Sequence, residues 1–428
     1  MKKPIKWVVW MLVISLLLSG CVMRTVDELY CLPKRTKADN DLQSVIDSAM
    51  TNLSYCAPLN GEKRQTVQSA DLDGDGVDEY VVLARNNSTE PLKILVFFQL
   101  ASGYALMDTI SAYGFGFDLV EFSNVDDRPG AEIIVGRQVG DGVVRSLAVY
   151  SVYSGVAREL LSANYSRVMV QDMDEDGRGE LMLLHPSAGS DRTCTVLLYR
   201  FQDKQLQIGS QMELPYALNN IKAMEGVTLR DGTPAMMIAA AEKNLQYTHL
   251  WNMRNRQLNQ VFGPAPAEKL DDRFVPPMDV DLDGDVDIPE LVPVRGTEGS
   301  ASQENWVLWY DVDVDGKRYD GMYTYYNYLD QWYLHLDSNW TRKLTVTGGD
   351  GITTFSNFDN EMVLSIHTIT GERRAEQAKK LGLTVLDNNS MVLYGAKLGE
   401  RAADFGITEQ RMTRLFYILG LNFDEQGD

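Results

Sequence analysis

A repeated acidic turn constrains the fold of this chain more than any other feature of its sequence. The five copies of the turn begin at Asp71, Asn124, Asp172, Thr228 and Asp279. The steps between these starts are 53, 48, 56 and 51 residues, and each copy runs directly into a short apolar stretch. A repeat of about 50 residues is the length of a four-stranded propeller blade. The spacing therefore predicts a β-propeller.

The segments between the turns have the pattern of strands. The first interval holds apolar runs typical of strands at residues 92–100, 104–110 and 117–122. Helical periodicity is almost missing from residues 65–330, which disfavours a doubly wound α/β fold. The predicted fold class is mainly β, with a β-propeller of about five or six four-stranded blades over residues 65–335. A small α+β domain is predicted to follow over residues 336–428.

Three of the turns carry carboxylates at positions 1, 3, 5 and 9 and a glycine at position 6. We name each loop by its first residue. The acids are Asp71, Asp73, Asp75 and Glu79 in the Asp71 loop, Asp172, Asp174, Asp176 and Glu180 in the Asp172 loop, and Asp279, Asp281, Asp283 and Asp287 in the Asp279 loop. Alternate residues of a tight loop can turn toward one centre, and glycine allows the sharp bend. The pattern predicts a cation site in each loop.

The ligand chemistry indicates which cation these loops bind. The backbone carbonyl of position 7 can add one more oxygen, from Val77, Arg178 and Asp285 respectively. Oxygen ligands in this number suit Ca²⁺ better than Zn²⁺, for which Cys and His are expected. Without a cation the acids of each loop repel one another. We therefore expect calcium in the three loops.

The other two copies depart from this pattern. The Asn124 loop has Arg128 at position 5, where a ligand is required, and the Thr228 loop has lost its acids. The Asp279 loop departs only at position 4, where Leu282 replaces the glycine found in the Asp71 loop. We therefore expect about three calcium sites among five motif-bearing blades.

Two other interpretations of the acidic loops compete with a calcium site. Asp-Gly pairs alone make tight turns between strands, but three copies with one spacing favour a shared ligand role. The Asp279 loop, with Glu290 as the twelfth residue, also matches an EF-hand. Pro289 and the β-rich flanks disfavour the helix that would have to follow.

The loops resemble those of FG-GAP or VCBS repeats, which are the calcium-loop blades of the integrin α-chain propeller. The resemblance covers roughly residues 65–330 and is carried by the Asp71, Asp172 and Asp279 loops. It implies that each loop joins two strands of a blade and holds one Ca²⁺. It also implies ligand roles for the matching Asp and Glu positions.

The first twenty residues have the three parts of an export signal. Lys2, Lys3 and Lys6 are followed by an uncharged apolar run over residues 7–18 and by small residues before Cys21. The string Leu-Ser-Gly-Cys resembles the lipobox of bacterial lipoproteins. An uncleaved membrane helix is disfavoured because the run falls short of the ~20 residues that span a bilayer.

The lipobox resemblance implies cleavage before Cys21 and a diacylglyceryl group on its thiol. Residues 1–20 are then the signal peptide and residues 21–64 the anchor and linker. Two acyl chains supply stable membrane attachment. We therefore expect a lipoprotein held on the extracytoplasmic face of the cell membrane, at the cell surface.

Charge and cysteines bear on the partners and the compartment. The formal net charge of −20 disfavours nucleic acid and anionic lipid headgroups as partners, and favours cations, basic proteins or neutral ligands. Outside the cytoplasm Cys31, Cys56 and Cys194 could oxidise. Two alternatives remain. Either a disulfide joins Cys31 to Cys56, or all three cysteines are free thiols.

Aromatic residues crowd the segment from Trp306 to Trp340. One interpretation is a platform for sugar rings or aromatic peptide side chains, formed by Trp306, Trp309, Tyr323 and Tyr325. The other is a hairpin that turns at Asp315-Gly316 and pairs its aromatics across strands.

The last part of the chain has a mixed pattern. Strands are predicted at residues 343–347, 352–355, 362–370 and 390–396, and a helix at 372–381. A final helix is expected to begin at Thr408, which can act as its N-cap. Its apolar stripe of Met412, Leu415, Phe416 and Leu419 is typical of core.

Signs of catalysis are weak in this sequence. The histidines His185, His249, His335 and His367 are scattered, and no nucleophile elbow or phosphate loop is found. We therefore expect a membrane-anchored binding or adhesion module for protein or glycan rather than an enzyme. The alternatives are a structural or sensory accessory of the cell envelope, or a hydrolase that uses a carboxylate pair.

Overall fold

A computed structural model describes residues 37–140, 145–268, 274–298 and 303–419. The predicted signal peptide, Cys21 and Cys31 lie outside these residues. None of the described helices is long and apolar enough to cross a membrane. Cys56 is half-buried and Cys194 is buried, and both are free thiols.

The described residues form six antiparallel sheets of four or five strands, so the prediction of a mainly β fold is confirmed. The first three sheets each use strands that follow one another in the sequence. The first contains β1 (Ser54–Tyr55), β2 (Val67–Ala70), β3 (Glu79–Arg85), β4 (Leu92–Leu100) and β5 (Gly103–Ala112); the second β6 (Gly116–Ser123), β7 (Glu132–Gln138), β8 (Arg145–Tyr153) and β9 (Val156–Tyr165); and the third β10 (Arg167–Gln171), β11 (Glu180–Pro186), β12 (Cys194–Gln202) and β13 (Gln205–Leu214).

The remaining three sheets continue this pattern, with one strand added from the end of the chain. The fourth contains β14 (Ile221–Thr228), β15 (Pro234–Glu242), β16 (Leu245–Arg254) and β17 (Gln257–Glu268); the fifth β18 (Ile288–Pro293), β19 (Asn305–Val312), β20 (Arg318–Asn327), β21 (Trp332–Leu336) and β27 (Phe416–Ile418); and the sixth β22 (Leu344–Gly349), β23 (Ile352–Asn357), β24 (Met362–Thr370), β26 (Val392–Leu398) and β25 (Thr384–Asn388).

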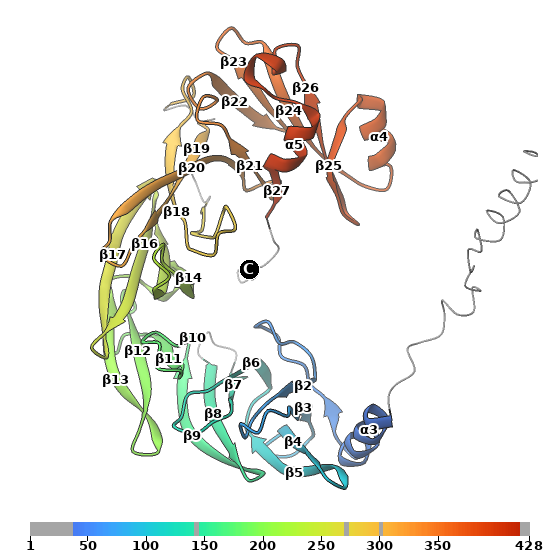
Figure 1. The fold of residues 1–428 in the computed structure, drawn as a ribbon, viewed down its shortest axis with the longest axis vertical. Helices are drawn as coiled ribbons and strands as arrows, with labels where there is room; N and C mark the ends of the chain where they lie inside the picture. The colour runs from blue at the N-terminus through green and yellow to red at the C-terminus, as the bar shows by residue number, and fades with distance from the viewer. Residues whose placement is uncertain (1–36, 141–144, 269–273, 299–302, 420–428) are drawn as a thin grey trace, which may run out of the picture.

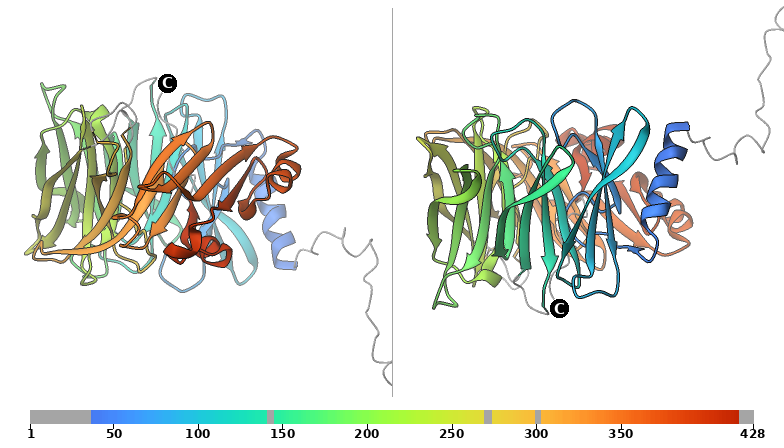
Figure 2. Two further views of the ribbon diagram at one scale, coloured as in Figure 1. Left: turned by 90° about the horizontal axis from the view of Figure 1, so that it is seen from above. Right: turned by 90° about the horizontal axis from the view of Figure 1, so that it is seen from below.

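The six sheets follow one another in chain order along an arc (Figure 1) and stack face to face (Figure 2). Five hydrophobic clusters each join one sheet to the next. Because successive side chains of a strand point to opposite faces, a sheet covered on both faces needs apolar residues at consecutive positions. Strand β15 shows this, since seven of its nine residues in a row are buried.

The outer faces of the first and last sheets are covered by helices. Helix α3 (Lys37–Ala49) packs Leu42 and Ile46 against Val82 and Phe97 of the first sheet. Helix α4 (Arg374–Leu381) packs Ala378 against the sixth sheet. Among the described residues no hydrophobic cluster joins the first sheet to the sixth, and Figure 1 shows the arc open between α3 and α4. Helix α3 lies in the segment predicted only as anchor and linker.

The end of the chain corrects one prediction. The hydroxyl of Thr408 accepts a hydrogen bond from the N–H of Arg411 at 3.2 Å, which confirms the N-cap. Helix α5 (Glu409–Leu415) nevertheless ends before Phe416, because β27 pairs there with the free edge of β21. Met412, Phe416 and Leu419 are buried as expected. The last described strand thus completes the fifth sheet. Two short 3-10 helices lie elsewhere in the chain, at Leu218–Asn220 and Ala402–Phe405.

The aromatic segment is core, and the predicted ligand platform is wrong. Trp306, Trp309 and Tyr325 are 2%, 0% and 4% exposed, and Tyr323 is packed against the cluster between the fifth and sixth sheets. The hairpin interpretation is confirmed, since β19 and β20 pair across the turn at Gly316. Trp306 and Tyr325 are enclosed between the fifth and sixth sheets, and Trp309 is buried in a separate cluster of the fifth sheet. These three side chains therefore offer no exposed aromatic face for a sugar ring.

Candidate metal centres

The acidic loops lie at equivalent places in their sheets. The Asp71, Asn124, Asp172 and Thr228 loops each connect the first repeat strand of a sheet to the next, and lie between β2 and β3, β6 and β7, β10 and β11, and β14 and β15. The Asp279 loop leads into β18, and a bridge between Met278 and Asp287 takes the place of the first strand. The repeat seen in the sequence is therefore a repeat in the fold.

The three acidic loops share one pattern of hydrogen bonds. The N–H of position 6 donates to the position-1 carboxylate, and the N–H of position 2 donates to the position-9 carboxylate. The first bond is 2.9 Å from Gly76 to Asp71, 2.8 Å from Gly177 to Asp172 and 3.0 Å from Gly284 to Asp279. The second is 2.7 Å from Leu72 to Glu79, 2.9 Å from Met173 to Glu180 and 2.9 Å from Val280 to Asp287.

Position 4 adopts a left-handed backbone in all three loops. Its φ is 78° at Gly74, 57° at Glu175 and 65° at Leu282. A residue with a Cβ atom pays about 1 kcal/mol or more for this conformation. Leu282 nevertheless follows the path of the Asp71 loop, and its side chain is 71% exposed. The departure noted in the sequence therefore leaves the loop geometry intact.

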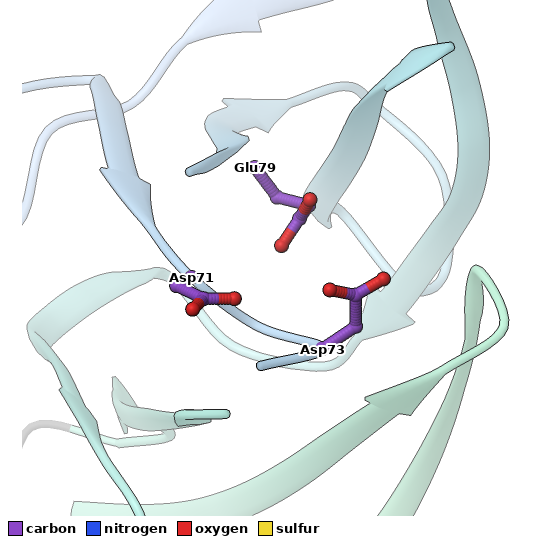
Figure 3. Close-up of side chains that lie close together, drawn as sticks. All are labelled: Asp71, Asp73 and Glu79. Atoms are coloured by element: carbon purple, nitrogen blue, oxygen red, sulfur yellow. The ribbon is translucent and has the colours of Figure 1, made fainter. Parts of the chain in front are cut away.

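The acids of positions 1, 3 and 9 converge in each of the three loops. Figure 3 shows the carboxylates of Asp71, Asp73 and Glu79 turned toward one another. One oxygen from each lies within 4.8 Å of the others, and the same holds for Asp172, Asp174 and Glu180 and for Asp279, Asp281 and Asp287. These acidic clusters could each hold a metal ion.

Positions 5 and 7 make a different set of contacts. The position-5 carboxylates accept the N–H of position 7, at 2.8 Å from Val77 to Asp75, 3.0 Å from Arg178 to Asp176 and 3.1 Å from Asp285 to Asp283. In this structure they stand outside the converging groups. The sequence grouped position 5 with positions 1, 3 and 9, because alternation alone does not show toward which centre each carboxylate turns.

Burial makes the position-9 acids costly to ionise. Desolvation raises the pKa of Glu79 to about 7, with the nearby Asp73 and Asp75 charges adding to the effect, while the N–H of Leu72 opposes it. Desolvation likewise raises the pKa of Glu180 to about 7 and raises that of Asp287. A cation among these oxygens would offset that cost, because it favours the charged form.

Two arginines, one within the loop and one from a neighbouring strand, contact the acids of the Asp172 loop. Arg200 of β12 places a guanidinium nitrogen 3.1 Å from Asp174 and 3.4 Å from Glu180. Arg178 pairs with Asp176 and thereby lowers the pKa of that carboxyl. Arg200 therefore contacts the same carboxylates that a cation would need.

In the Asn124 loop the cation is built into the chain. Arg128 pairs with Asp126 at 3.1 Å, and Asp126 is fully buried. The hydroxyl of Ser151 donates to the same carboxylate at 3.0 Å. Glu132 at position 9 still accepts the N–H of Val125, at 2.8 Å, and burial raises its pKa to about 7.

The loops of neighbouring sheets are joined by a repeated backbone hydrogen bond. The N–H of position 8 donates to the position-1 carbonyl of the preceding loop, at 2.9 Å from Ala131 to Asp71, 2.7 Å from Gly179 to Asn124 and 3.0 Å from Val286 to Thr228. The Asn124 loop thus lies between two loops with converging acids. A shift in the backbone of one loop would therefore move the hydrogen-bonded backbone of the next loop.

A fourth acidic group was missed by sequence reasoning. Asp285 and Asp287 lie with Asp311 of β19 so that one oxygen of each is within 4.8 Å of the others. Arg230, at position 3 of the Thr228 loop, pairs with Asp311. The only signal in the sequence is the alternation Asp311, Asp313, Asp315, which was attributed to the hairpin turn.

No protein-family model matches the chain, and a search of curated proteins found no match either.

Proposed function

We propose that the three acidic loops bind Ca²⁺ and that calcium holds neighbouring sheets in place. The observation that carries this proposal is the agreement among three loops in backbone path, hydrogen bonds and converging carboxylates. Three carboxylates and further oxygens from backbone or water match the six to eight hard ligands that Ca²⁺ takes. Ligands from Cys or His are missing from each group, which disfavours Zn²⁺.

The sheets are, in this proposal, blades of a propeller that resembles FG-GAP or VCBS proteins. Six sheets of four or five strands in chain order, stacked face to face, support this interpretation, as does the loop repeated at one place in the first five of them. Helices α3 and α4 would cover the two end blades in place of a ring closure.

The protein is further proposed to be a lipoprotein attached through Cys21 to the extracytoplasmic face of the membrane. Extracytoplasmic calcium is available there to fill the loops. The rigid stack would then act as a non-catalytic binding or adhesion module for protein or glycan. Its excess of acid favours basic or neutral partners over nucleic acid.

Thermal unfolding of the mature protein tests the calcium proposal. A ligand that binds only the native state stabilises it by about 2.7 kcal/mol at a hundred times its dissociation constant. We expect the melting temperature to rise with millimolar Ca²⁺ and to change little with equal Mg²⁺, whose octahedral demand fits these loops poorly. Identical curves with chelator and with calcium would refute the proposal.

Metabolic labelling with a fatty acid tests the anchor. The wild-type protein should be labelled and recovered with membranes, whereas Cys21→Ser should carry no label. Label on the Cys21→Ser protein would contradict lipidation at this residue. The calcium experiment is independent of this result.

A further inference from the structure

We propose a second divalent-cation site next to the Asp279 loop, formed by Asp285, Asp287 and Asp311. The inference deepens the proposed function, because Asp287 belongs both to this group and to the group of Asp279 and Asp281. Strand pairing explains how the acids meet. Ile288 of β18 faces Tyr310 of β19, so Asp287 and Asp311 follow at adjacent ends of the same ladder.

All three acids are withdrawn from solvent. Asp285, Asp287 and Asp311 are 9%, 2% and 6% exposed, unlike most acids of the loops. Buried carboxylates at this separation repel one another and lose hydration, so they are stable as a charged group only with a counter-ion. Burial thus distinguishes this group from an acidic surface turn.

Asp285 gives the second, independent observation. Its Oδ1 atom is buried and accepts no hydrogen bond. Buried polar atoms in folded proteins nearly always have a partner, and an exception calls for a bound water or ion. The missing partner of Asp285 is therefore assigned to the cation.

A cavity borders the acidic group on the side of Asp285. It has a volume of about 340 Å³, lies between the fourth and fifth sheets, and is lined by Asp279, Gly284 and Asp285 among others, but not by Asp287 or Asp311. A polar cavity of this size holds several waters, since one water needs about 30 Å³. Water oxygens can complete the shell of a cation bound by three carboxylates.

Arg230 neutralises one negative charge of the clustered carboxylates and leaves the rest of their charge unbalanced. It pairs with Asp311, while its own side chain is 48% exposed and stacks over Tyr319. The two groups that share Asp287 hold five carboxylates together, and one guanidinium leaves four negative charges, which two divalent cations balance. Because the donors are carboxylates, the site would take a hard cation such as Ca²⁺.

Asp311→Asn is the direct test, because Asp311 is not among the acids of the Asp279 loop. We expect native mass spectrometry of the mature protein in saturating Ca²⁺ to count one ion fewer than in the wild type. Asp315→Asn is the matched control, since Asp315 lies in the same hairpin with its side chain 82% exposed. The control should keep every ion.

Arg230→Gln gives a second test with the opposite sign. Removing the guanidinium from Asp311 should leave the ion count unchanged and tighten one Ca²⁺ site by roughly tenfold in calorimetry. The inference is overturned if Asp311→Asn keeps every ion, or if it cannot be folded and Arg230→Gln leaves all affinities as in the wild type.

The ion counts of two variants also distinguish a failure of this second site from a failure of the three loop sites. If Asp73→Asn loses an ion while Asp311→Asn loses none, the loops bind calcium and only the second site is wrong. If the wild-type protein binds no Ca²⁺, both the proposed function and this inference are refuted.

Discussion

The Asp71 and Asn124 loops lie side by side, and they differ in how the negative charge of their acids is balanced. In both, a buried position-9 glutamate accepts the N–H of position 2, at 2.7 Å in the first and 2.8 Å in the second. In the Asn124 loop, Arg128 supplies the positive charge to Asp126. Among the described residues, no arginine or lysine is paired with the converging acids of the Asp71 loop.

The difference shows that a repeat can keep its fold while it changes the source of its counter-ion. A guanidinium carried by the chain is present at all times, whereas a free cation binds according to its concentration. The Asp172 loop lies between these cases, because its acids converge but Arg200 contacts two of them. Substitution of the arginines therefore distinguishes a cation built into the chain from a bound one.

The largest effect is expected from Arg128→Met. The Arg128 side chain is 33% exposed, so we expect a cost of about 3 kcal/mol, at the low end for a buried ion pair, because Asp126 would remain buried without its counter-charge. Urea unfolding with and without Ca²⁺ measures this. Arg178→Met, whose ion pair with Asp176 is more exposed, is the control and should cost about 1 kcal/mol or less. Equal costs for the two variants would mean that Arg128 is not the counter-ion of its loop.

The next effect concerns the pH dependence of Glu132. Burial raises its pKa in the folded protein to about 7, above the ordinary value of 4.5. Its stabilising contribution is therefore fully present below pH 4.5 and is lost as the pH rises through 7, by about 3 kcal/mol at most. Glu132→Gln should remove this part of the pH dependence.

Saturating Ca²⁺ should leave the contribution of Glu132 unchanged, because Arg128 and not a metal lies in its loop. Unfolding free energies measured between pH 4 and pH 8 in calcium provide the check. A variant whose pH profile overlays that of the wild type would show that Glu132 is not the group responsible.

The smallest effect is expected from Arg200→Met. Without the guanidinium, Asp174 and Glu180 are free to bind the ion, and the Asp172 loop should gain roughly tenfold in Ca²⁺ affinity, about 1.4 kcal/mol. Calorimetric titration measures the change. Arg254→Met is the control, since its exposed side chain pairs with Asp315 and should leave every affinity unaltered. An unchanged Asp172 site would show that Arg200 does not compete.

Much of the fold could be predicted because the signals are local. The run at 92–100 coincides with β4, and the run at 362–370 with β24. The stripe of Met412, Phe416 and Leu419 correctly indicated burial, but burial alone did not distinguish a helix from the strand that pairs with β21. The crowded aromatics were ambiguous for the same reason, since residue type does not reveal that two sheets enclose Trp306.

The candidate site could be predicted only within single loops. Positions 1, 3 and 9 were found from spacing, because their convergence depends on one short stretch of backbone. Asp311 and Arg200 come from other strands, and they reach the loops through sheet pairing that the sequence does not display. The role of Arg128 was visible because it lies inside the motif.

The most direct test of the account is the number of Ca²⁺ ions held by Asp73→Asn and Asp126→Asn. These residues occupy position 3 of adjacent loops, so the pair differs in the source of the counter-ion and not in place. Native mass spectrometry of the folded proteins in saturating calcium should count one ion fewer for Asp73→Asn and the wild-type number for Asp126→Asn. A full count for Asp73→Asn, or a lost ion for Asp126→Asn, would contradict the assignment of bound calcium to one loop and of Arg128 to the other.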